Sequence, residues 1–156
     1  MPESQLDVPM SNEDTAAAGT VLGSGGLVIF DDSVCMVDLG KYMMAFNAIE
    51  SCTRCTTCRI GTARLTDIFN RMSRGEGLMS DLEVIRWLGP VMIETTLCGL
   101  GQAAPVPAVA LVDHFRAELE AHILEHRCPA GVCEQLVIGA PGAERINESK
   151  ILKISV

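Results

Sequence analysis

Apolar residues recur every three or four positions over most of residues 38–123, the spacing that is typical of amphipathic α-helices. The pattern predicts helices over about 38–50, 56–74 and 80–97, and a fourth that begins at about Pro105. The apolar stripes that define them are Tyr42, Met43, Phe46 and Ile49; Leu65, Ile68, Phe69 and Met72; Leu82, Ile85 and Leu88; and Val112, Phe115, Leu119 and Ile123. Four helices joined by short loops predict a mainly α fold, a four-helix bundle.

Outside the bundle the pattern changes. The segment 23–26 is a flexible glycine-rich turn, and the apolar run 27–30 predicts a short buried β segment. The C-terminal residues Ile151, Leu152, Ile154 and Val156 are apolar, which suggests an extended segment that docks on another surface. We therefore divide the chain into a β-containing region over 1–34, a helical bundle over 35–133 and a C-terminal docking tail over 134–156.

Two local signals refine the third helix. Ser80 is followed three residues later by Glu83, which predicts a capping box at the start of this helix. Gly89 and Pro90 lie in its middle, and a proline there removes a backbone hydrogen bond, so a kink is expected.

Composition narrows the functional class. The chain has 156 residues, 12 basic against 20 acidic, and a formal net charge of −8, which argues against nucleic acid as a partner. No apolar run is long enough to insert into a membrane, and the polar N-terminus does not resemble a signal peptide, so we expect a cytoplasmic protein. The mean hydropathy of +0.28 is high and suggests that a partner covers part of the apolar surface.

Seven cysteines are far more than a chain of this size normally carries, and their odd number argues against a disulfide framework. Three of them form the C-x2-C-x2-C run SCTRCTTCR, and a fourth lies in the glycine-flanked TLCGLGQ. This spacing favours a 4Fe–4S cluster over zinc or a redox dithiol, although both remain alternatives. The predicted cluster ligands are Cys52, Cys55, Cys58 and Cys98.

The remaining cysteines suggest a second metal site. Cys128 and Cys133 bracket the loop CPAGVC, directly after a helix that carries His122 and His126. Two thiolates, one imidazole and Cys35 would complete a tetrahedral zinc site. A second iron–sulfur cluster, or Cys35 as a simple buried residue, are the alternatives.

No carboxylate pair or cysteine–histidine dyad is arranged for acid–base or nucleophilic catalysis. His114 and the acidic positions Glu118 and Glu120 are interpreted as solvated helix surface. The catalytic set is therefore empty, and the chemistry is assigned to the metals.

The strings ESCTRCTTCR, TLCGLGQAAPVP and CPAGVC, with their surroundings from Leu6 to Cys133, resemble one known family. It is the C-terminal region of the flavin- and NADH-binding subunit of respiratory complex I, with relatives in NAD-linked, electron-bifurcating hydrogenases and formate dehydrogenases. The resemblance implies a helical bundle after the end of a β-grasp-like domain, with the same four cysteines on a 4Fe–4S cluster. It also implies a structural metal at CPAGVC with His122 as the imidazole. Thr53 and Thr57 stand where the family usually has Gly and Pro.

The resemblance implies electron transfer rather than catalysis by this chain alone. In the family, FMN and NAD bind a preceding domain that this sequence lacks, so both are expected only on a partner or a missing domain. The expected partners are that flavoprotein and other iron–sulfur subunits of a larger NAD(P)H-linked oxidoreductase. Two alternatives remain: an assembly module whose cluster and zinc are structural, and a thiol–disulfide sensor.

Overall fold

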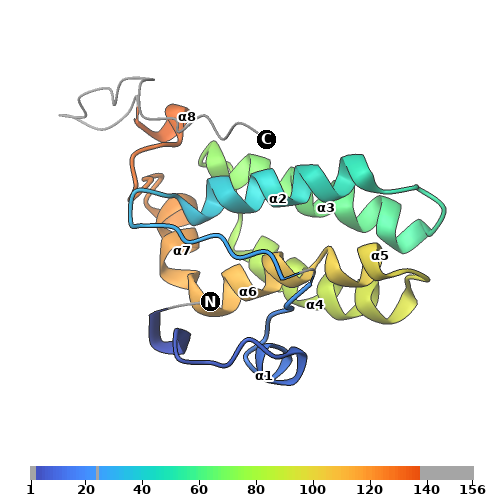
Figure 1. Ribbon diagram of the computed structural model, residues 1–156. Helices are drawn as coiled ribbons and strands as arrows, with labels where there is room; N and C mark the ends of the chain where they lie inside the picture. Colours follow the sequence, from blue (N-terminus) through green and yellow to red (C-terminus); the bar gives the residue numbers. More distant parts are fainter. Residues whose placement is uncertain (1–2, 24, 138–156) are drawn as a thin grey trace, which may run out of the picture.

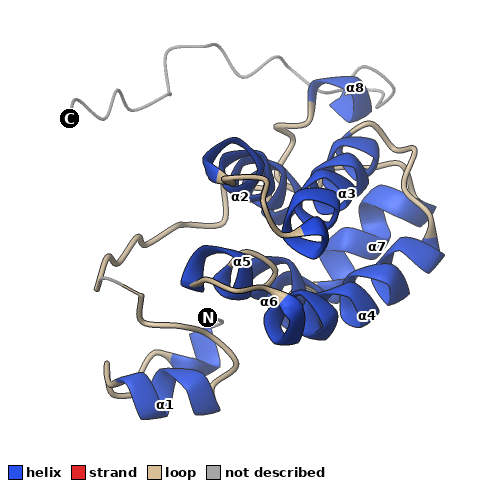
Figure 2. Ribbon diagram, turned by 90° about the vertical axis from the view of Figure 1, so that its right-hand side faces the viewer, coloured by secondary structure: helices blue, strands red, loops and turns tan. Residues whose placement is uncertain are grey.

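The computed structural model describes residues 3–23 and 25–137, and these residues contain helices and loops but no strand (Figures 1 and 2). The mainly α fold class predicted from periodicity is thereby confirmed. The elements in chain order are η1 Glu3–Gln5, α1 Asn12–Ala17, α2 Met36–Glu50, α3 Thr56–Ser73, α4 Met79–Thr95, α5 Gly99–Ala103, α6 Val106–His114, α7 Arg116–Leu124 and α8 Glu134–Val137.

The bundle is built in two layers. Helices α2 and α3 pack side by side as an antiparallel pair, and α4, α5 and α6 lie beneath them (Figures 1 and 2). Helix α7 contacts α2 and α3 at the end of the bundle that α8 also occupies. This arrangement brings the loop after α2 and the loop after α4 to the opposite end of the bundle (Figure 1).

The core lies between the layers, and three of the predicted stripes form it. Every residue of the stripe on α3 is fully buried, as are Leu82 and Ile85 on α4 and Val112 and Leu119 farther along the chain. Burial of side chains of this size contributes about 1.5–3 kcal/mol each, which is why these stripes fix the helix orientations.

The apolar stripe on α2 behaves differently. Tyr42, Phe46 and Ile49 are 70%, 54% and 79% exposed, and α2 faces the core with Val37, Gly40 and Met44 instead. A Cβ at Gly40 would overlap the ring of Phe69 on α3, so only glycine allows the helices this close an approach. Three of the four residues of the predicted stripe therefore lie on the surface, and the fourth, Met43, packs against the core.

The predicted fourth helix is two helices. Its backbone leaves the helical conformation at Phe115, which has φ −124° and ψ 27°, and α7 begins at the next residue. The local sequence contains neither glycine nor proline there, so no local signal announces the break. In contrast, α4 continues through Pro90 to Thr95.

The start of α4 also differs from prediction. The helix begins at Met79, and the carboxylate of Asp81, not the Ser80–Glu83 pair, accepts the backbone N–H of Leu78 at 2.8 Å. The same carboxylate, whose side chain is 2% exposed, accepts a hydrogen bond from Arg71 on α3 at 2.7 Å. This bond raises the pKa of the Arg71 guanidinium. Asp81 thus caps α4 and fastens it to α3.

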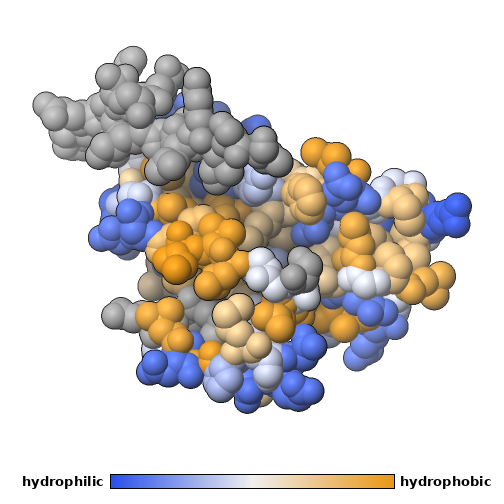
Figure 3. Space-filling view, in the orientation of Figure 1, coloured by the Kyte–Doolittle hydropathy of each residue, from blue (hydrophilic) through white to orange (hydrophobic). Residues whose placement is uncertain are grey.

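The predicted β segment is absent. Residues 27–30 form no strand, and their side chains are exposed, with Ile29 at 85%. They belong to the long connection that crosses the face shown in Figure 3, where apolar side chains gather. A β segment at 27–30 would need a partner strand, and the described residues contain none, which is why the prediction was wrong.

Most of the predicted docking tail, 138–156, lies outside the described residues.

Among the described residues, no helix combines the length and the hydropathy needed to cross a membrane.

Replacing Asp81 by Ala is expected to lower the free energy of unfolding by about 2–3 kcal/mol, because a helix cap and a nearly buried charge-assisted hydrogen bond are both lost. Urea unfolding followed by circular dichroism measures the effect. Asp113→Ala breaks the exposed Arg86–Asp113 ion pair and is the control, with a loss of about 1 kcal/mol at most. Equal losses in the two variants would contradict the role given to Asp81.

Candidate metal centres

A pocket at one end of the bundle is lined by the four cysteines predicted to bind a cluster. Its walls are the loop between α2 and α3 and the start of α5, and its volume is about 80 Å³, several times the room that one water needs. We call these four residues the pocket cysteines: Cys52, Cys55, Cys58 and Cys98. Glu50, Ser51 and Leu100 complete the lining.

The loop that carries three of these thiols is held by its own hydrogen bonds. The hydroxyl of Ser51 lies 3.4 Å from the sulfur of Cys58 and accepts the backbone N–H of Thr53 at 3.2 Å. Arg59 donates to the carbonyl of Thr53 at 2.8 Å. Cys55 occupies the N-cap of α3, so the positive end of the helix dipole faces the pocket. This environment favours an anionic group.

The pocket cysteines surround a space rather than a point. They do not belong to the one set of ligand atoms among the described residues that is compact enough for a single ion. A cubane cluster needs this wider arrangement, because each thiolate binds a different iron at a different corner. Cys52 and Cys98 are exposed and Cys58 is buried, so the pocket opens to the surface.

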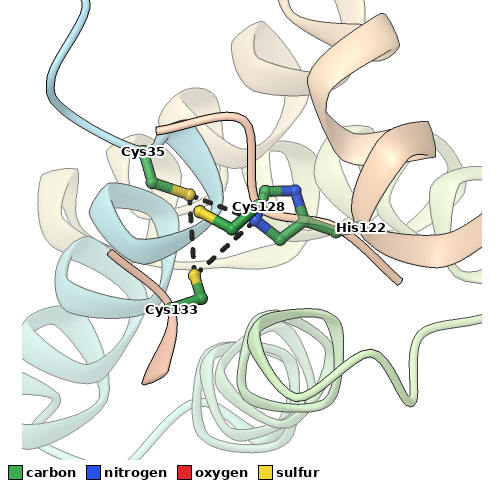
Figure 4. Close-up of side chains that lie close together, drawn as sticks. All are labelled: Cys35, His122, Cys128 and Cys133. Carbon is green, nitrogen blue, oxygen red and sulfur yellow. Dashed lines mark hydrogen bonds between the residues drawn. The ribbon is translucent and has the colours of Figure 1, made fainter. Parts of the chain in front are cut away.

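A second group of ligands lies at the other end of α2. The structure brings together one atom each from four buried residues, all within 4.8 Å of one another (Figure 4). We call them the buried quartet: Cys35, His122, Cys128 and Cys133. The sulfur of Cys35 is 3.3 Å from Nε2 of His122 and 3.7 Å from the sulfur of Cys133, and Cys133 is 3.6 Å from the same nitrogen.

Three elements position the members of the quartet. Cys35 is the N-cap of α2, where its sulfur accepts the N–H of Asp38 at 3.5 Å. His122 is on α7 and is 0% exposed, and Cys128 and Cys133 enclose the loop before α8. His126, the other candidate imidazole, lies outside the quartet and contacts the carbonyl of Gly75 at 2.8 Å.

The four buried groups hydrogen-bond to one another, and these bonds shift their pKa values. Hydrogen bonds from Cys133, Cys35 and His122 lower the pKa of the Cys128 thiol, and the bond to Cys128 raises the pKa of Cys35. The pKa of Cys133 is raised to about 12, chiefly by its bond with Cys128. Burial alone would lower the pKa of His122, but bonds to Cys128, Cys35 and the Glu118 carbonyl raise it to about 10. A cation would replace the protons of these bonds.

The structure adds two polar residues that sequence reasoning did not assign to a site. Ser51 contacts the sulfur of Cys58, and its position next to Cys52 was the only sequence signal. Glu118, interpreted as solvated surface, instead accepts the backbone N–H of Met36 at 2.8 Å. No sequence signal could reveal this contact, because it joins residues 82 positions apart.

Helix α2 connects the two sites. Cys35 precedes its first residue and Cys52 lies two residues after its last, so the 15-residue helix, about 22 Å long at 1.5 Å per residue, separates them.

Comparison with protein families gives one matching model, described as the NADH-ubiquinone oxidoreductase-F iron–sulfur binding region, over residues 38–122. All four pocket cysteines fall inside this match. Of the buried quartet only His122 does, and the three thiols lie beyond either end.

Curated proteins give the same picture. The chain is 42% identical over 132 residues to NADP-reducing hydrogenase subunit HndC of Solidesulfovibrio fructosivorans, covering 85% of this chain and 27% of the relative. It is 43% identical over 129 residues to an F-type subunit of the NADH-quinone oxidoreductase of Rhizobium meliloti, covering 83% and 31% respectively. The chain thus spans about a quarter to a third of these relatives.

Among solved structures, the chain is similar to a chain of an NAD+-reducing NiFe-hydrogenase in its H2-reduced state. The sequence identity is 34% and the TM-score 0.59, over 62% of this chain and 17% of that one.

Thr53 in the cysteine loop has φ 63°, a left-handed conformation that costs a β-branched residue about 1 kcal/mol or more. We expect Thr53→Gly to raise the melting temperature, with a net gain of about 0.5–1 kcal/mol after the entropy cost of glycine. Thr57→Gly, in the first turn of α3, is the matched control and should lower the melting temperature slightly. A lower melting temperature in both variants would contradict the strain at Thr53.

Proposed function

The chain belongs to the family of the NADH-ubiquinone oxidoreductase-F iron–sulfur binding region, and from this premise we propose that it relays electrons through one 4Fe–4S cluster held by the pocket cysteines. One observation carries the proposal: four thiols from two separate loops line a single pocket. The cluster supplies the one-electron chemistry, and the chain supplies ligands, hydrogen bonds and access.

The surroundings of the pocket suit a cluster that exchanges electrons. The Ser51 hydroxyl next to Cys58 and the N-terminus of α3 both stabilise negative charge, which favours the reduced state. The exposure of Cys52 and Cys98 leaves the cluster near the surface, where a short distance to a partner's redox centre permits rapid transfer.

The electron donor is proposed to be a flavin, FMN, reduced by NADH on a partner chain or on a further domain. The relatives are named as subunits of an NADP-reducing hydrogenase and of NADH-quinone oxidoreductases, and this chain matches only 27% and 31% of their length. Other iron–sulfur subunits would accept the electron. The exposed apolar residues on α2 and at 27–30 offer surface for such partners.

For the buried quartet we propose a structural zinc ion. A tetrahedral zinc with Zn–S of about 2.3 Å and Zn–N of about 2.0–2.1 Å places two sulfurs roughly 3.8 Å apart, and sulfur and nitrogen roughly 3.5 Å apart. The separation of 3.7 Å between the sulfurs of Cys35 and Cys133 fits the first value. The separations of 3.3 and 3.6 Å between these sulfurs and Nε2 of His122 fit the second. Zinc has no redox chemistry, so this site would hold α2, α7 and the CPAGVC loop together. Both sites need reduced thiols, which fits the cytoplasm.

Anaerobically purified protein is expected to contain about four irons, four sulfides and one zinc per chain. Cys55→Ala should lose most of the iron and keep the zinc, whereas Cys133→Ala should lose the zinc and keep the iron. Elemental analysis of both variants checks that iron and zinc occupy separate sites, and each variant is the other's control. Loss of both metals from both variants would contradict two independent sites.

The isolated, reconstituted chain is expected to be reduced by dithionite, giving the electron paramagnetic resonance signal of a reduced 4Fe–4S cluster, but not by NADH. The reason is that hydride transfer from NADH needs a flavin. Addition of a flavoprotein with NADH oxidation activity is the positive control. Reduction by NADH alone would refute the proposal that the chain only relays electrons. A cluster that dithionite cannot reduce would favour the alternative of an assembly module with structural metals.

A further inference from the structure

Glu118 contacts one member of the quartet, His122, and the residue that follows a second member, Cys35. Its backbone carbonyl lies 2.8 Å from Nδ1 of His122, one turn farther along α7. Its side-chain oxygen accepts the backbone N–H of Met36 at 2.8 Å, and Met36 directly follows Cys35. Glu118 is half-buried, so both contacts are partly shielded from water.

Each contact fixes a metal ligand. A carbonyl acceptor places the proton of a neutral imidazole on Nδ1 and leaves the lone pair on Nε2, the nitrogen that faces the three sulfurs. The side-chain contact fastens the first turn of α2 to α7, and the Cys35 sulfur moves with that turn, because Cys35 is its N-cap.

We propose that the side chain of Glu118 is a positioning group for the metal of the buried quartet, because its carboxylate holds Cys35 in place through Met36. Its backbone carbonyl orients His122 whichever residue stands at this position. The proposal rests on metal binding by the quartet, as put forward above. It gives this acidic residue a function that neither its type nor its place on the helix indicates.

The side chain acts as a hydrogen-bond acceptor, not as a charge. A zinc ion with three thiolates and one neutral imidazole carries a net negative charge, so a nearby carboxylate adds no attraction. Glutamine retains an acceptor oxygen at the same reach and should replace Glu118. If the carboxylate served only to stabilise the N-terminus of α2 by its charge, glutamine would fail.

The experiment measures zinc release from the full chain to an excess of a coloured chelator. Mutation of a group that holds a metal ligand in position typically costs 10- to 100-fold in metal affinity. Glu118→Ala should therefore release zinc 10 to 100 times faster than the wild type. Glu118→Gln should stay within about threefold of the wild type. Glu120→Ala is the matched control, since Glu120 lies on the same helix and pairs with Arg116.

A second pair of variants removes the donor instead of the acceptor. Met36 is the first residue of α2, a position where proline is tolerated, and Cys35 has φ −80° and ψ 126°, which suits a residue before proline. Met36→Pro removes the N–H and should match Glu118→Ala, whereas Met36→Ala keeps the N–H and should resemble the wild type. Combining Met36→Pro with Glu118→Ala should add little further loss.

The outcomes separate the two proposals. A wild-type chain without zinc would overturn the metal assignment and with it the role of Glu118. Zinc-loaded wild type with equally slow release from Glu118→Ala, or with Glu118→Gln as fast as Glu118→Ala, would overturn only the positioning role. Iron content reports independently whether each variant is folded, and the Met36 pair decides if Glu118→Ala fails to fold.

Discussion

The close packing of α2 against α3 is the constraint on which both candidate metal centres depend. It is possible because Gly40 faces the ring of Phe69, where any larger residue would overlap it. Gly61 does the same for α3 and α4, since a Cβ there would overlap Met92. These contacts fix α2, and α2 carries Cys35 before its first residue and leads into Cys52 after its last. A shift of this helix would move ligands at both ends.

The two ends of α2 provide opposite environments, and these suit different metals. The pocket is open, its thiols surround a volume, and its polar contacts stabilise negative charge, as a cluster that exchanges electrons requires. The buried quartet is closed and its potential ligand atoms lie within 4.8 Å of one another, as a small ion with fixed tetrahedral geometry requires. One end is thus suited to redox chemistry and the other to holding the bundle together.

The surface of α2 carries exposed apolar side chains. Glycine at the helix contact allows the core to be filled by α3, so the larger apolar residues of α2 face outward. They begin beside the pocket, because Ile49 is three residues from Cys52. A molecule that covered this face would therefore also lie close to the pocket.

Sequence patterns were sufficient to predict the helical class, the buried stripes on α3 and α4, and the two cysteine-rich strings SCTRCTTCR and CPAGVC. These follow from periodicity and short spacing, which are local properties. The tertiary structure decided which face of α2 is buried, where the helix breaks at Phe115, and that residues 27–30 form no strand, since each depends on neighbours distant in sequence. The contact of Glu118 with Met36 likewise exists only once α7 packs against α2.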